Sequence, residues 1–308
     1  MALVVLIGLS CNPGEEPREE PAEALNVVMA GYDVAVGRGQ RFIVGAGTSD
    51  NRFVSFGQAK LRFAFQGTKD KPVSGPFGKT VTASFLLVDG APTGPPPREA
   101  RAGSASQGRG VYETRVDFDQ PGFWKVRFEV DLESGRASGD TTFEVLSEHR
   151  VPAPGDRAPA TENLTLHSTD APRQAVDSRG ADGPIPDEVL HAHTVAEALA
   201  AGRPAVVVLS TPVFCVSRFC GPVTDIVQEL AGSYADRAWF IHIEVWRDFQ
   251  AKTINKAAAE WIYRADDLNE PWVFLIGADG VITERWDNVL SKSELEESLK
   301  ALPRLPSP

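Results

Sequence analysis

The chain has 308 residues, of which 42% are hydrophobic and 24% charged, so it is long enough for two domains, each with its own core. Its formal net charge is −11 and no basic stripe is present, which argues against a nucleic-acid partner because phosphate binding needs clustered Lys and Arg.

The amino terminus is a short apolar run, Met1–Leu9, which is followed by Ser10 and Cys11. It is too short to span a bilayer, which takes about 20 residues, but it fits the apolar core of a secretory signal. The run resembles the end of a bacterial lipoprotein signal, which implies a lipid on Cys11 and anchoring to the outer face of the bacterial cytoplasmic membrane. No basic residue precedes the run, and Gly8 stands where such signals carry Leu, so an unmodified apolar leader is the alternative.

Residues 12–24 are charged and rich in proline, so they cannot bury enough apolar surface to fold and would form a disordered acidic tether. Residues 25–147 are predicted to form short strands separated by turn residues. Apolar and polar residues alternate in Val116–Phe118 and Val126–Val130, which we expect to pair as a hairpin through Asp119–Gly122. The pattern predicts an all-β sandwich. The segment Gly110–Val126 resembles the closing hairpin of bacterial immunoglobulin-like domains.

A polar linker and leading segment cover residues 148–186, and residues 187–308 form the predicted core of a second domain. There the pattern changes to alternating strands and helices, which predicts a buried mixed or parallel sheet. The predicted strands are Ala205–Ser210, Trp239–Val245, Trp272–Ile276 and Val281–Trp286. Two of the predicted helices begin with capping boxes, at Thr194 and at Ser291, and the other two cover Pro222–Tyr234 and Thr253–Tyr263.

Cys215 and Cys220 are the residues that point most strongly to chemistry, because they follow a strand and directly precede a Gly-Pro helix start. Unpaired amides at a helix start stabilise a thiolate. In a regular helix the two Cα atoms would be about 7.5 Å apart along the axis. A disulfide needs roughly 4.4–6.8 Å. A disulfide therefore requires a loop here, with the helix beginning near Pro222.

Two interpretations of this pair remain open. In the first, the disulfide opens and closes in thiol–disulfide exchange, with Cys220 activated by the helix start and by Arg218. In the second, a permanent disulfide closes a small loop in a non-catalytic binding or scaffolding lipoprotein. Which cysteine is the nucleophile is not decided by the residues.

The element order over about residues 150–303 resembles the thioredoxin fold. Pro154–Pro159 is similar to the leading segment of the membrane-anchored thioredoxins of the TlpA/ResA type. Glu270 and Pro271 stand where that family carries a cis-proline beside its cysteines, so the resemblance implies a cis bond there.

The sequence departs from that family at the cysteines. Cys220-Gly221-Pro222 is similar to the family's Cys-Gly-Pro-Cys without its last cysteine, but four residues separate Cys215 from Cys220 where the family has two. The family's buried acid corresponds to Leu209. The resemblance implies an α/β thioredoxin-like domain and an extracytoplasmic oxidoreductase that acts on proteins with thiols or disulfides, with Pro271 shaping the partner groove and no cofactor.

Metal sites have weak support in the sequence. His242 lies on a predicted strand, where a buried or half-buried, hydrogen-bonded imidazole is expected. His191 and His193 lie on one side of an extended segment, and such a pair without a neighbouring acid or cysteine is expected at the surface. We therefore expect no metal.

Overall fold

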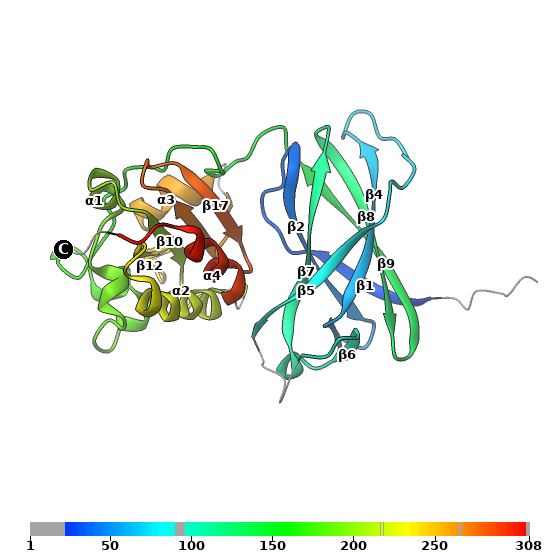
Figure 1. Ribbon diagram of the computed structural model, residues 1–308, viewed down its shortest axis with the longest axis horizontal. Coiled ribbons are helices and arrows are strands. Elements are labelled where there is room, and N and C mark those ends of the chain that lie inside the picture. Colours follow the sequence, from blue (N-terminus) through cyan, green and yellow to red (C-terminus); the bar gives the residue numbers. More distant parts are fainter. Residues whose placement is uncertain (1–21, 90–95, 216, 218, 265–266, 306–308) are drawn as a thin grey trace, which may run out of the picture.

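The computed structural model describes residues 22–89, 96–215, 217, 219–264 and 267–305. Two parts lie side by side in it: a unit of long strands and a unit in which helices cover a sheet (Figure 1). We call the first, residues 23–145, the barrel, and the second, residues 149–305, the C-terminal unit.

The barrel contains nine strands in the described part of the chain. They are β1 (Glu23–Met29), β2 (Gly37–Thr48), β3 (Phe53–Ser55), β4 (Gln58–Gly67), β5 (Val81–Asp89), β6 (Arg101–Gly103), β7 (Arg109–Phe118), β8 (Gly122–Leu132) and β9 (Gly135–Val145). A 3₁₀ turn, η1 (Ala105–Gln107), precedes β7.

Seven of these strands form a closed ring. Their order is β1-β9-β8-β4-β5-β7-β2, and β1 pairs with β9 on one side and with β2 on the other. Full closure leaves no unpaired edge within the ring. The predicted β-sandwich is therefore wrong, and so is its immunoglobulin-like assignment. The alternation of apolar residues tells which face of a strand is buried, and it does not tell whether the outer strands of a sheet meet.

Aromatic side chains fill the barrel interior. Phe42 is fully buried and packs edge-on against Phe63, with 4.9 Å between the ring centroids, and in a tilted arrangement against Phe143 at the same distance. Phe118 contacts the same group. Edge-to-face packing is the favoured geometry for such rings. These residues come from four strands, so the aromatic cluster joins opposite walls of the barrel.

The expected hairpin between β7 and β8 is also wrong. β7 pairs with β2 and β5, whereas β8 pairs with β4 and β9. The residues Asp119–Pro121 therefore connect strands that are not neighbours in the sheet. Phe118 and Trp124 still touch, with 5.2 Å between ring centroids, because they lie on either side of that short connection.

The C-terminal unit begins with three 3₁₀ turns and continues with short strands and helices. Its elements are η2 (Arg173–Ala175), η3 (Ser178–Gly180), η4 (Glu188–His191), α1 (Val195–Ala200), β10 (Ala205–Ser210), α2 (Cys220–Tyr234), β11 (Trp239–Glu244), β12 (Trp246–Asp248), β13 (Thr253–Ile254), α3 (Lys256–Ile262), β14 (Tyr263–Arg264), β15 (Asp267–Leu268), β16 (Trp272–Ile276), β17 (Ile282–Asp287) and α4 (Lys292–Ala301).

The central sheet of this unit has the order β11-β10-β16-β17. Only β10 and β11 are parallel, and the other two pairs are antiparallel. The two faces of the sheet have separate apolar cores: α1 and α3 pack on one face, and α2 and α4 pack on the other. The predicted capping boxes at Thr194 and Ser291 are confirmed.

The predicted fold class is nevertheless wrong as a description of this chain. The described residues are predominantly β, with a closed barrel and four α-helices, and the α/β thioredoxin-like domain predicted after an immunoglobulin-like sandwich is not upheld. The helix expected over Thr253–Tyr263 is limited to Lys256–Ile262, and two-residue strands flank it. Apolar residues at helical spacing over so short a segment are compatible with a full helix and with a shorter helix between strands. The sequence pattern therefore overestimates the helical content.

The barrel and the C-terminal unit share a polar and apolar interface. Arg41 on β2 contacts three carboxylates, of Glu113, Asp287 and Glu294. Arg285 on β17 binds Asp33 at 2.9 Å. The apolar part contains Ile43, Val111 and Val289, against which Phe219 packs; Phe219 directly precedes α2. The start of α2 is therefore held against the barrel.

Candidate functional site

Cys215 and Cys220 form a disulfide, with 6.0 Å between their Cα atoms. Cys215 lies in the segment after β10 and is partly exposed, whereas Cys220 is the first residue of α2 and is fully buried. The segment between them is not helical where the structure describes it, as the sequence argument requires for a disulfide.

The helix begins slightly earlier than predicted. The backbone amide of Val223 donates to the Phe219 carbonyl at 2.9 Å, so Cys220, Gly221 and Pro222 all lie in the first turn of α2. Pro222 is tolerated there because first-turn amides have no partner within the helix. The predicted supporting residue Arg218 and the predicted lipidation residue Cys11 lie outside the described residues.

Glu270 and Pro271 lie beside the disulfide, and the predicted cis bond between them is confirmed. A carboxylate oxygen of Glu270 and the two sulfur atoms all lie within 4.8 Å of one another. Burial, with a contribution from the nearby Glu244 charge, raises the pKa of Glu270 to about 7. Glu270 is therefore an acid that can hold or release a proton near neutral pH next to the sulfurs.

A second buried acid, Glu244 at the end of β11, was not identified from the sequence. Its carboxylate accepts hydrogen bonds from the Thr211 hydroxyl at 2.6 Å and from the Ser178 amide at 2.8 Å. Burial raises the pKa of Glu244. Leu209, which corresponds to the buried acid of the thioredoxin family, is a fully buried core residue. The acids near the disulfide come instead from β11 and from the residue before the cis-proline.

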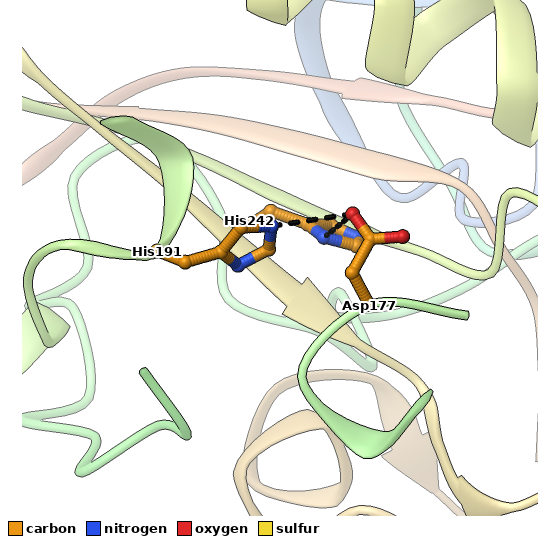
Figure 2. A group of neighbouring side chains, drawn as sticks. All are labelled: Asp177, His191 and His242. Atoms are coloured by element: carbon orange, nitrogen blue, oxygen red, sulfur yellow. Dashed lines mark hydrogen bonds and ion pairs between the residues drawn. The ribbon is translucent and has the colours of Figure 1, made fainter. Parts of the chain in front are cut away.

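Behind this region, Asp177, His191 and His242 form a fully buried cluster (Figure 2). Asp177 caps η3, His191 ends η4 and His242 lies in the middle of β11. Oδ2 of Asp177 is 3.2 Å from Nε2 of His191 and 3.4 Å from Nδ1 of His242. Arg179 binds the same carboxylate, with Nη2 2.7 Å from Oδ2.

The electrostatics of this cluster follow from burial and from the central carboxylate. Burial disfavours a charged Asp177, but the hydrogen bond with His191, the neighbouring His242 imidazole and the bonds from Arg179 outweigh it and hold the pKa of Asp177 far below its usual range. Burial lowers the pKa of His191. For His242 burial acts in the same direction, but Asp177 outweighs it and the pKa is raised.

A chain of hydroxyl groups connects this cluster to α2. Nε2 of His242 lies 3.1 Å from Oγ of Ser210, which lies 2.7 Å from Oγ1 of Thr224. Thr224 donates to the carbonyl of Cys220 at 2.7 Å. The buried imidazole and the disulfide-bonded helix start therefore belong to one hydrogen-bonded group.

The sequence predicted part of this cluster. The prediction of a buried, hydrogen-bonded His242 is confirmed. His191 and His193 have different surroundings. His191 is buried and contacts Asp177, whereas His193 stacks on Trp239 with 3.7 Å between ring centroids. Asp177 lies in the predicted linker, residues 148–186, where no periodic pattern marks it as a buried residue.

Comparisons with known proteins do not identify a family for this chain. No known family matches the chain, and no curated protein matches it. Among solved structures, MtrC from Shewanella baltica OS185 is similar with 9% identity and a TM-score of 0.25, over 42% of this chain and 24% of that one. BslA, a bacterial hydrophobin, is similar with 13% identity and a TM-score of 0.20, over 40% of this chain and 96% of that one. TM-scores this low support no argument about fold or function.

The predicted membership of the thioredoxin-like superfamily is therefore corrected. The chain matches no family, and its described part is predominantly β with a closed barrel. Among the described residues, no helix is both long and apolar enough to cross a bilayer.

Proposed function

We propose that the protein is a non-catalytic binding or scaffolding module in which the Cys215–Cys220 disulfide is structural. The observation that carries this proposal is the position of the bond. Cys220 is fully buried, and its neighbour Phe219 packs against the apolar cluster that joins the barrel to the C-terminal unit. Closing the loop before α2 restrains Phe219, so the disulfide supports the interface between the two units.

The proposal extends to location and partners. A disulfide persists in oxidising compartments outside the cytoplasm. We propose that the chain is exported and held at the outer face of the cytoplasmic membrane by a lipid on Cys11, and that its partners are extracytoplasmic proteins. The expected result for Cys11→Ala is loss of the protein from the membrane fraction, with Cys215→Ala as the matched control that stays there. Equal fractionation of the two variants would contradict the anchor.

The structural role has a direct test in the reduction potential. A structural disulfide has a potential below about −300 mV and resists the glutathione pool. We expect such a value in glutathione and dithiothreitol buffers, together with no catalysis of disulfide exchange in a model substrate. We also expect the double variant C215S/C220S to be cleaved faster by proteases at the interface. A potential well above that value, with turnover of the substrate, would reject the structural role.

A second candidate function is thiol–disulfide exchange, and Glu270 is the observation that favours it. A partner thiolate would attack the partly exposed Sγ of Cys215, the Cys215–Cys220 bond would break, and the Cys220 thiolate would take a proton from Glu270. A second partner thiol, as its thiolate, would then attack the mixed disulfide and release Cys215. The partner leaves with one new disulfide, and this chain leaves with two thiols.

The two candidates differ in what single-cysteine variants retain. Exchange predicts that Cys220→Ser traps partners through Cys215, whereas Cys215→Ser traps none because Cys220 is buried. The structural role predicts no trapped partner in either variant. Mass spectrometry of non-reduced extracts separates these results.

A further inference from the structure

Asp177, His191 and His242 present three donor atoms toward one point from three different elements (Figure 2). The atoms are Oδ2 of Asp177, Nε2 of His191 and Nδ1 of His242, and all lie within 4.8 Å of one another. All three side chains are fully buried. Two imidazoles and one carboxylate are a common donor set for a divalent transition metal.

The spacing of the donors fits a metal ion between them. Zinc binds imidazole nitrogen and carboxylate oxygen at about 2.0–2.2 Å, so two donors of a tetrahedral site are about 3.3 Å apart. The two printed separations from Oδ2 of Asp177 are 3.2 Å to His191 and 3.4 Å to His242. These distances match the edges of such a tetrahedron.

The hydrogen bonds of His242 leave one nitrogen for a metal. Nε2 lies 3.0 Å from the carbonyl oxygen of Ser210, which can only accept, so Nε2 carries a proton. Within the described part of the chain, Nδ1 makes no hydrogen bond of acceptable geometry, although it is buried and faces Asp177. In the neutral ring a lone pair therefore faces a carboxylate. A cation between them removes that repulsion.

The surroundings supply the support that metal ligands usually have. Ser210 orients His242 from behind, and Arg179 binds the Asp177 carboxylate, with its backbone amide on Oδ1 at 2.8 Å. Such outer contacts hold the first ligands in place. The Arg179 guanidinium contacts three carboxylates in all, those of Asp177, Asp187 and Asp225, so negative charge exceeds positive charge around the cluster.

We propose that Asp177, His191 and His242 bind one divalent transition metal ion of the zinc type. With three protein ligands, one position is left for a water molecule or another small ligand. The ion would join η3, η4 and β11, which are otherwise connected through loops. Cys215 and Cys220 are not part of this site, because their sulfurs are bonded to each other.

The test measures metal binding by the oxidised full chain. Chelator-treated protein is titrated with Zn²⁺ and Co²⁺, the bound metal is counted by mass spectrometry, and the visible spectrum of Co²⁺ reports nitrogen and oxygen ligation. We expect one equivalent per chain. We expect His191→Gln and Asp177→Asn to weaken binding by at least about 100-fold, the upper end of what loss of an outer contact costs.

Two controls separate this site from other histidines and from the cysteines. His193→Gln removes a partly exposed imidazole two residues from His191 and should leave binding unchanged. The double variant C215S/C220S should also retain one equivalent. If a ligand variant fails to fold, the titration of the unmodified chain still decides. No stoichiometric metal in the unmodified chain, equal binding by His191→Gln and His193→Gln, or loss of metal with the cysteines would each overturn the proposal.

Discussion

Arg41 gives the sharpest prediction about what holds the barrel to the C-terminal unit. Its side chain is only 7% exposed, and it lies 3.3 Å from Glu113, 3.5 Å from Asp287 and 3.2 Å from Glu294. Nη2 also donates to the carbonyl of Val289 at 3.0 Å. One guanidinium on the barrel therefore neutralises carboxylates from both units.

Substituting Arg41 by Met keeps the apolar stem and removes the charge. Three partly buried carboxylates and a carbonyl then lose their common partner. Removing one member of a buried ion pair costs about 3–5 kcal/mol, because the remaining charge stays desolvated. Burial already raises the pKa of Glu113 to about 7, with Arg41 acting in the opposite direction. Without Arg41 this pKa should rise further, so the loss of stability should be larger at pH 8 than at pH 5.

The assay is urea denaturation followed by tryptophan fluorescence, with Arg52→Met as the matched control. Arg52 pairs with Asp50 at 2.8 Å, but both side chains are about half exposed. A pair of that kind contributes under about 1 kcal/mol. The reasoning is refuted if Arg41→Met destabilises the chain no more than Arg52→Met does, or if its effect is the same at both pH values.

Three further predictions concern the C-terminal unit. The double variant C215S/C220S should lose about 2 kcal/mol of unfolding free energy, because the disulfide closes a six-residue loop and so lowers the entropy of the unfolded chain. Urea denaturation of oxidised protein measures this loss, and no loss would contradict a restraining role. The pKa of Glu270 is raised from 4.5 to about 7, so the folded state binds its proton more tightly and stability should fall by up to about 3 kcal/mol as pH rises through this range. Glu270→Gln should remove that slope in denaturation curves at pH 5 and 8, and an unchanged slope would show that another group is responsible. Ser291→Ala should cost about 1 kcal/mol, because Ser291 caps α4 through the amide of Glu294, and equal thermal unfolding of variant and parent would contradict the cap.

The sequence predicted the local elements better than their arrangement. The caps at Thr194 and Ser291, the end of α2 at Tyr234 and the cis bond before Pro271 are all in the structure. These features depend on a few neighbouring residues. Closure of the barrel depends on Glu23 meeting Ala137, and no local pattern encodes such a pairing.

The sequence predicted the cysteine pair of the candidate site, but it did not predict the buried acids near that pair. Cys215 and Cys220 are close because a strand end and a helix start meet, which the residue types indicate. Glu244 lies at the end of a mostly apolar strand, and Asp177 lies in a segment without a helical or strand periodicity of apolar residues. Both become buried only when distant segments pack around them. Their importance therefore depends on tertiary contacts that a single sequence does not show.

The pairing of β1 with β9 has a consequence for the order of events during biosynthesis. The first strand of the ring stays without one of its two neighbours until the ninth has left the ribosome, since Glu23 pairs with Ala137. Contacts so far apart in the chain form slowly, and domains generally fold as units as they emerge. One edge of β1 therefore stays unpaired through the synthesis of more than a hundred residues, and export before folding would move that exposed interval to the far side of the membrane.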